Sequence, residues 1–371
     1  MLNVRLRVLL LGVLSLLSFA SCETEPGVSD TWDRRAMLSH WADEIIIPAW
    51  DSYSEVTSQL VLAADSFHSN TSSDNYQGLI AAYQAAYLAW QKVSLFEIGP
   101  SEQNSVRVRS NTFPVDTAAV NARLAQYDGT NMPNLMLPST FIEQGFPALD
   151  YLLNGHDSDA DAVAFFQDQM YAAAYVKELA KALDDLASTV ADTWNTTYRN
   201  TFVTADGSSA SASTNKVAND FIFHYEKELR AGKIGIPSGV FSSATFPEKV
   251  ESVFDPEFSK ALFEQSLDAH IDFFNGTTFD KMTVGPSFAQ YLDHLGAMED
   301  GIALSTAVDD QFLASRVALQ NVDSDFKSTV ETDVYKMLAL YDELQRNTIR
   351  IKTDVMQTLN VKIDYVDADG D

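Results

Sequence analysis

The chain has 371 residues, of which 52 are acidic and 25 are basic, so its formal net charge is −27. This excess of negative charge argues against binding to nucleic acid or to anionic lipid head groups. The single cysteine excludes an intramolecular disulfide, and the length is ample for two domains.

Residues 1–22 have the pattern of a secretory signal sequence. Arg5 and Arg7 precede an apolar run at 8–19 that is too short to span a membrane, and small residues then lead to Cys22. The ending FASC resembles a bacterial lipobox, in which the cysteine is lipidated and becomes the first mature residue. We therefore expect an acyl anchor at Cys22. The alternative is ordinary signal cleavage near an unmodified thiol.

The next residues, 23–30, form a polar tether, and apolar residues then recur at helical spacing. The clearest stripe comprises Val176, Leu179, Leu183, Leu186, Val190 and Trp194. A further stripe, at 330–359, predicts one very long final helix. Strand-like alternation is scarce, so an all-α protein is predicted.

A small, polar segment at 203–214 is poor in helix-forming residues and predicts a linker. It divides the chain into two helical-bundle domains, at 31–202 and 215–363, which we expect to pack side by side. A loose echo of residues 145–155 within residues 286–301 is compatible with an internal duplication. Two other stretches, 99–140 with its four prolines and 231–247, have the composition of long loops, which often carry function.

No motif of a common hydrolase is present. A zincin needs adjacent histidine and glutamate, a pair absent from this sequence, and neither a nucleophile elbow nor a phosphate-binding loop occurs. His224 and Glu228 lie one helical turn apart and are a candidate two-ligand metal site. The favoured interpretation of this pair is a surface ion pair or another polar contact on a helix face.

The segment IEQGFPALDYLLNG, residues 142–155, predicts the start of a helix. Gly145 interrupts the preceding pattern, and Pro147 suits the first helical position. Asp150 would then fall in the first turn, where a carboxylate gains about 0.3–1 kcal/mol from the helix dipole. This interpretation requires no ligand.

Several segments taken together resemble the imelysin family. They are WADEIIIPAW (41–50), AYLAWQKVSLFEIGP (86–100), FPVD (113–116), GFPALDYLLNG (145–155) and LRAGKIGIPSG (229–239). The resemblance implies an all-helical, two-domain protein that is exported or lipid-anchored, with a site at the interface of the two domains. The family is linked to iron uptake and is also classed as a metallopeptidase family.

The chain departs from the family at two positions. The family carries G-x-H-x-x-E, whose histidine and glutamate form a plausible metal pair, whereas Pro147 and Asp150 occupy those places here. Proline has no lone pair for a metal and aspartate reaches less far, so weak transition-metal binding is expected. The binding residues that the resemblance implies at the interdomain cleft are Glu97, Asp116, Gly145, Pro147, Asp150, Arg230 and Lys233.

Among these residues, Asp116 and Asp150 are weak metal candidates that could form an acidic site with Glu97. Arg230 and Lys233 would face them across the domain junction. The alternative for this basic pair is a helix C-terminus capped by Gly232.

The resulting expectation is a binding component in iron or metal-complex uptake, attached to the cell envelope as an outer-membrane lipoprotein that faces the periplasm or the cell surface. No cofactor is certain, and iron or another divalent cation is the candidate. The alternatives are a metal-dependent peptidase of the family, disfavoured by the missing zinc motif, and a non-catalytic scaffold that partners an outer-membrane transporter.

Overall fold

The computed structural model describes residues 30–365, so the predicted lipidation site Cys22 lies outside the described residues. The chain divides at Trp32, and every described helix and strand belongs to the compact unit that begins at Asp33. The chain is 71% helical, which confirms the predicted all-α class. Among the described helices, none has the length and apolarity needed to cross a membrane.

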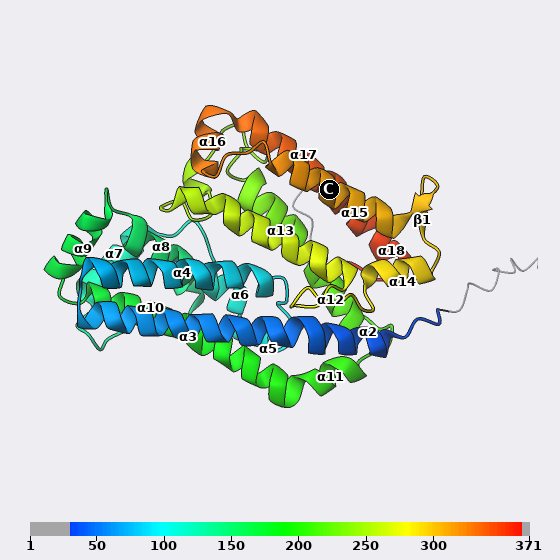
Figure 1. Cartoon of the computed structure of the whole chain (residues 1–371), viewed down its shortest axis with the longest axis horizontal. Helices are drawn as coiled ribbons and strands as arrows, with labels where there is room; N and C mark the ends of the chain where they lie inside the picture. The colour runs from blue at the N-terminus through cyan, green and yellow to red at the C-terminus, as the bar shows by residue number, and fades with distance from the viewer. Residues whose placement is uncertain (1–29, 366–371) are drawn as a thin grey trace, which may run out of the picture. The chain divides into compact units, whose positions relative to one another are not determined.

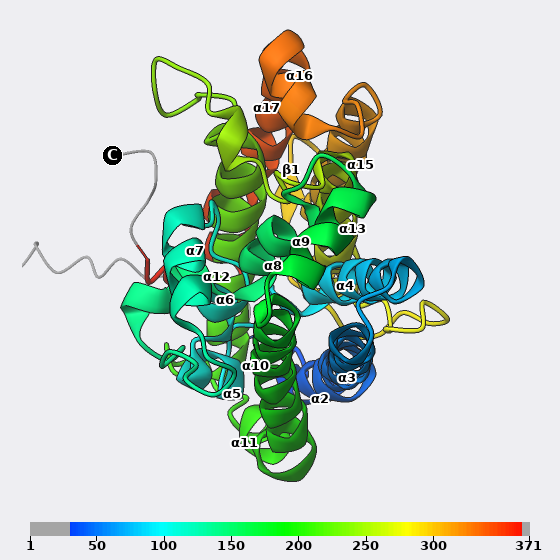
Figure 2. The same ribbon diagram turned by 90° about the vertical axis from the view of Figure 1, so that its left-hand side faces the viewer.

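In the first half of this unit the long helix α3 packs lengthwise against two other long helices, α4 and α10 (Figures 1 and 2). The predicted stripe of α10 is buried from Val176 to Val190, as its spacing required. The elements of this half are α2 (Arg34–His40), η1 (Trp41–Ile46), α3 (Ile47–Ser69), α4 (Ser73–Val93), α5 (Pro100–Asn104), α6 (Val106–Ser110), α7 (Thr117–Gln126), η2 (Pro138–Glu143), α8 (Gly145–Asn154), α9 (Asp159–Asp168), α10 (Ala172–Thr193), η3 (Trp194–Tyr198) and α11 (Arg199–Thr204).

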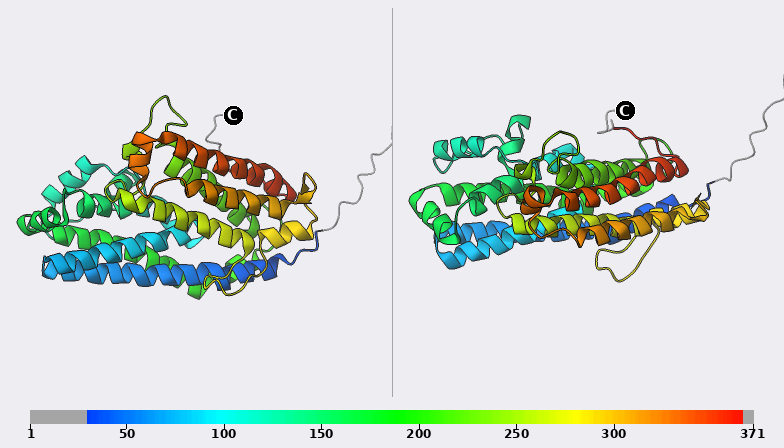
Figure 3. Two further views of the ribbon diagram at one scale, coloured as in Figure 1. Left: turned by 45° about the horizontal axis from the view of Figure 1, so that its top comes forward. Right: turned by 90° about the horizontal axis from the view of Figure 1, so that it is seen from above.

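The second half is a further group of helices, in which α17 packs against α15 and η4, and α13 packs against α4 of the first half (Figure 3). Its elements are α12 (Ser213–Phe223), η4 (His224–Gly235), η5 (Pro247–Lys249), η6 (Pro256–Phe258), α13 (Ser259–Asn275), α14 (Phe288–His294), β1 (Met298–Glu299), β2 (Ile302–Ala303), α15 (Leu304–Leu319), α16 (Phe326–Thr332), α17 (Val334–Arg350), η7 (Ile351–Val355) and α18 (Met356–Thr358). Residues 205–212 separate α11 from α12, where the linker is predicted. The domain boundaries and the duplication stay predictions.

Two expectations about local structure were wrong. The proline-rich stretch 99–140 is not one long loop, because prolines begin the short helices α5 and η2 and positive φ angles at Gly99 and Ser105 separate successive turns. The final helix does not include Val330, because Asp333 adopts an extended φ of −151° and separates α16 from α17.

Helix α8 carries the G-x-P-x-x-D segment into the core. Gly145 has a φ of +73°, and a Cβ atom on it would lie 2.2 Å from the carbonyl oxygen of Ser110. Phe146 stacks on Tyr87, with ring centroids 4.4 Å apart. The segment therefore has a packing role, in which glycine lets α8 approach the end of α6.

Asp150 lies in the interior of α8 and not in its first turn, contrary to expectation. It is only 2% exposed, and it accepts hydrogen bonds from the Phe254 N–H and from Asn154 Nδ2, both at 3.0 Å. Burial raises the pKa of Asp150 to about 7, although these hydrogen bonds oppose the shift. The helix dipole therefore does not explain this aspartate.

Gly145→Ala should destabilise the fold by about 3 kcal/mol or more, because the new methyl group adds backbone strain to a clash with Ser110. Gly78→Ala is the matched control, since a Cβ at Gly78 meets nothing within 4 Å. Inside a helix that change should stabilise by about 0.5–1 kcal/mol. Urea unfolding of both variants measures the difference, and equal effects would contradict the assigned role of Gly145.

Asp150→Asn should remove part of the pH dependence of stability. The folded state keeps a proton on Asp150 that the unfolded chain releases near the ordinary aspartate pKa of 3.8. The contribution of this retained proton to the free energy of unfolding is therefore complete below pH 3.8, declines as pH rises, and is lost above about pH 7. At about 1.4 kcal/mol per pKa unit, this contribution amounts to at most about 4 kcal/mol. Urea unfolding at several pH values should show a smaller decline for the variant, and parallel profiles would refute the assignment.

Candidate functional site

The candidate site is organised by η4, which continues α12 as a π-helix. Its hydrogen bonds include one from the Ile236 N–H to the Ala231 carbonyl five residues earlier, at 2.8 Å. In this geometry residues four and five positions apart share a face. His224, Glu228 and Lys233 consequently line one cavity.

A buried polar network joins η4 to α4 and to the end of α6. Lys233 Nζ donates to Gln91 Oε1 at 3.0 Å and forms an ion pair with Glu251. Glu251 Oε1 also accepts from Gln91 Nε2 at 3.1 Å and from Asn111 Nδ2 at 2.7 Å. Tyr87 Oη in turn donates to Asn111 Oδ1 at 2.7 Å. The polar groups of Gln91 and Asn111 are thus committed to the fold.

Arg107 on α6 forms a second buried centre. Its Nε and Nη2 donate to the carbonyl oxygen of Ser94 at 2.9 and 2.7 Å, and Nη2 also bonds both oxygens of Asp220 at 2.9 and 3.0 Å. Asp220 accepts the Glu97 N–H at 2.6 Å. Burial raises the pKa of Asp220 to about 6, although Arg107 opposes the shift. No described residue bonds Nη1 of Arg107.

These elements enclose an inner cavity of about 10 Å³ and an outer pocket of about 370 Å³. The inner cavity has room for a single water molecule or ligand atom. Four residues line both spaces: Arg107, Asn111, Phe113 and Glu228. The inner cavity is therefore the polar end of the outer pocket.

Three cationic side chains line the outer pocket, namely Arg107, Lys227 and Lys249. Arg107 pairs with Asp220 and Lys227 lies 3.6 Å from Glu226, and the wall itself also carries the carboxylate of Glu228. Lys249 lies over the ring of Phe246, with its Nζ 4.1 Å from the centroid, and has no carboxylate partner among the described residues. The rim can therefore attract an anionic group.

Two side chains that line the inner cavity, Glu228 and His224, keep acceptor atoms that no described residue bonds. Within the described residues, Glu228 has neither a hydrogen bond nor an ion pair, and burial raises the pKa of its carboxyl although Arg107 and Lys233 oppose the shift. His224 is 2% exposed and has one polar partner in that same part of the chain, His270, at 3.2 Å from Nδ1 to Nε2. Burial lowers the pKa of His224 well below its ordinary value. His224 is thus buried and Glu228 is half-buried, and both keep acceptor capacity that no described residue uses.

The predicted carboxylates Glu97, Asp116 and Asp150 do not form one metal site. Exposed Asp116 caps α7 through the Ala119 N–H at 2.9 Å, and buried Asp150 serves the backbone near Phe254. Glu97 accepts from the Arg107 N–H and lines a neighbouring pocket of about 340 Å³. Over residues 30–365, no group of three or more His, Cys, Asp or Glu side chains could hold a metal ion.

The two predicted cations pair with other carboxylates instead of facing Asp116 and Asp150. Arg230 is fully buried, lies 3.6 Å from Glu226 and stacks on Tyr341, and Lys233 pairs with Glu251. Lys233 thus lines the inner cavity, whereas Gly145 and Pro147 contribute packing in α8.

The sequence interpretation of His224 and Glu228 was wrong, because His224 is buried and Glu228 forms no ion pair with a described residue. Their spacing was the available signal. Arg107 and Glu251 had no comparable signal, since Arg107 lies within the stretch predicted as a loop and Glu251 acts through a turn between η5 and η6.

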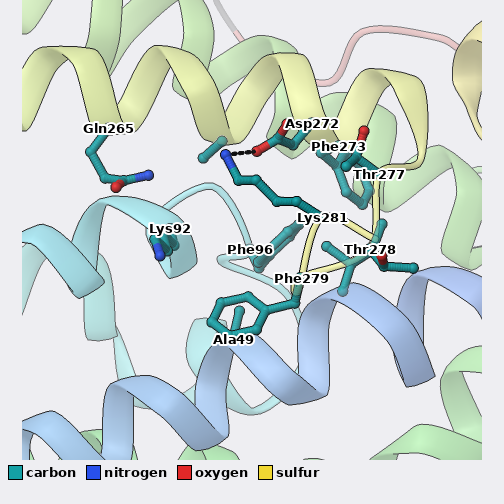
Figure 4. A pocket seen from close by; sticks show the side chains of 12 residues that line it. Ala49, Lys92, Phe96, Gln265, Asp272, Phe273, Thr277, Thr278, Phe279 and Lys281 are labelled. Carbon is teal, nitrogen blue, oxygen red and sulfur yellow. Dashed lines mark ion pairs between the residues drawn. The ribbon is translucent and has the colours of Figure 1, made fainter. Parts of the chain in front are cut away.

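A separate pocket of about 40 Å³ lies between α3, α4 and α13 (Figure 4). Phe279 and Ala49 form an apolar wall, and Lys281 Nζ pairs with Asp272 across it at 2.9 Å. Lys92 lies over the ring of Phe279, with its Nζ 5.2 Å from the centroid. The charged groups of this pocket already contact other residues, Lys281 with Asp272 and Lys92 with Phe279, so this pocket is a weaker candidate than the one at η4.

Comparison with known proteins identifies the family. An imelysin-like protein from Psychrobacter arcticum has a similar fold, with a TM-score of 0.70 and 17% identity over 90% of this chain and 97% of that chain. A protein from Parabacteroides distasonis that is named as a candidate iron-regulated protein A precursor gives a TM-score of 0.74 and 14% identity. This match also covers 90% of this chain and 97% of that chain. No curated protein matches the chain. The family model described as imelysin, peptidase M75, matches residues 46–351, and the chain therefore belongs to the imelysin family.

Proposed function

We propose that this protein is an exported binding component that takes a small anionic metal complex into the pocket between α6 and η4. The observation that carries the proposal is the pairing of a cationic rim with two uncommitted acceptors, Glu228 and His224, at the inner end of one pocket. Uptake of iron or of a metal complex is the process that such binding would serve.

The charges favour a complexed metal over a bare cation. A bare cation in the pocket would meet Arg107, Lys227 and Lys249, and two like charges 4 Å apart repel by about 4 kcal/mol at an effective dielectric constant of 20. Carboxylates of a chelator would reverse that interaction and bond the free Nη1 of Arg107. The metal at the centre of the complex would then meet acceptors at the inner end.

Iron is the favoured metal because one structural relative has a name that refers to iron regulation. A zinc peptidase receives less support, since it needs about three protein ligands and a bound water. The described residues offer no group of three such ligands. An outer-membrane transporter as the partner that receives the complex remains part of the proposal.

Lys249→Gln should weaken binding of ferric citrate and ferric nitrilotriacetate by about tenfold, or about 1.4 kcal/mol, because it removes a rim cation that makes no ion pair with a described carboxylate. Lys327→Gln is the matched control, with the same charge change at a position that lines none of the pockets described above. Quenching of the intrinsic tryptophan fluorescence reports occupancy, because Trp90, one of the five tryptophans, lines the inner cavity. No saturable binding of either complex, or equal affinities of the two variants, would overturn the proposal.

The proposed location depends on Cys22, which lies outside the described residues. Cys22→Ala should stall processing or release the protein into the soluble fraction, because alanine has no thiol to carry the predicted lipid. Stable attachment needs two or more acyl chains, and this variant would have none at residue 22. Fractionation of cells that express the variant tests this. A processed variant that stays with membranes like the wild type would place the anchor elsewhere.

A further inference from the structure

Apolar side chains from three segments meet in the outer pocket of about 370 Å³. Val108 on α6 is 42% exposed and Ile236, directly after η4, is 40% exposed, so both leave apolar surface in contact with solvent. Half-buried Phe113 and exposed Pro114 complete this apolar wall. Single exposed apolar residues are common on protein surfaces, whereas several that line one pocket mark a binding site for an apolar group.

The uncharged polar side chains of the lining are already used by the fold. Asn111 takes part in the buried network around the Lys233 ion pair, and the Thr112 hydroxyl donates to the Val108 carbonyl oxygen at 2.6 Å. Gly232 contributes no side chain, and a Cβ atom there would lie 3.9 Å from Phe113 Cζ. The Phe113 ring is therefore left uncovered on the side of η4, where a second ring can pack against it.

The charges of the lining suit a single anionic group. Arg107 and Lys227 each have a carboxylate partner, whereas half-buried Lys249 has none among the described residues. Glu228 adds a carboxylate to the same lining and disfavours a ligand with several negative charges. One cation is thus available for a ligand, beside an apolar wall.

We infer that the outer pocket recognises an aromatic monocarboxylate, whose charge contacts Lys249 while its ring packs against Phe113, Val108 and Ile236. The inference rests on the proposed function for the choice of this pocket, and it names the organic part of the ligand. The volume lies within the range of small-molecule sites, which are mostly apolar and have a few polar groups that fix orientation. The inner cavity has room for about one water molecule, so the ring stays in the outer pocket.

Two probes separate the ring of the ligand from its charge. 2-Naphthoate has both the aromatic body and the carboxylate, and 2-naphthamide has the same body without the charge. By calorimetry the wild type should show one saturable site for 2-naphthoate and should bind 2-naphthamide about tenfold more weakly, because the amide makes no charged contact. Lys249→Gln should bind the two probes equally, and a difference that persists in this variant would contradict the assigned role of Lys249.

Val108→Thr tests the apolar wall with a matched control. Threonine has nearly the shape of valine but places a hydroxyl against the ligand ring, so the affinity for 2-naphthoate should fall at least about fivefold. Val317→Thr makes the same change on α15, at a position that is 51% exposed and lines none of the pockets described above, and should leave the affinity unchanged. Urea unfolding checks that both variants keep the fold. Equal affinities of the two folded variants would overturn the inference.

Ferric citrate and ferric nitrilotriacetate distinguish this inference from the proposed function. Neither complex has an apolar body, so their affinities should depend on Lys249 and not on Val108. Saturable binding of a ferric complex without binding of 2-naphthoate would refute the inference and leave the proposed function standing. Binding of 2-naphthoate that depends on Lys249 and Val108, with no binding of either ferric complex, would support the inference and contradict the proposed function. No saturable binding of any of these ligands would refute both.

Discussion

The buried ion pair between Lys233 and Glu251 is the interaction on which the site depends. Gln91 bonds both members of the pair and Asn111 donates to Glu251. These contacts connect α4, the end of α6, η4 and the turn after η5. Removing one partner of a buried pair leaves an uncompensated charge and costs about 3–5 kcal/mol. The arrangement of the cavity walls is therefore strongly specified, and the pocket is formed before any ligand arrives.

Helix α8 packs against Ser110 and Tyr87, which are next to this polar network or part of it. Gly145 lets α8 touch Ser110 beside Asn111, and Phe146 stacks on Tyr87, whose hydroxyl orients Asn111. The family places its metal-like pair on this segment, whereas here the same segment packs against the wall of a pocket whose free acceptors lie on η4. Gly145, Pro147 and Asp150 are therefore buried parts of α8, and the side chains that line the inner cavity come from other elements, among them η4.

The sequence predicted those features that follow from regular spacing. The stripe of α10 was recognised because apolar residues recur at the α-helical period, and burial followed. Lys233 was singled out for the site, but its face could not be predicted, because η4 follows π-helical geometry that no local propensity signals. Glu251 and Arg107 become neighbours of Lys233 and Glu228 only through tertiary packing. Asp150 was misread because its helix begins two residues before Pro147.

The net charge of −27 and the basic pocket have different ranges of influence. At physiological salt the Debye length is about 8 Å, so the acidic surface repels an approaching anion only weakly beyond that distance. Inside the pocket, contacts with Lys249 and Arg107 act over a few ångströms and are partly shielded from solvent, so salt screens them much less. Selection therefore depends on short-range contacts and not on long-range steering. Under the proposed function, a ligand gains affinity when its anionic groups contact Lys249 and Arg107 at the rim of the outer pocket.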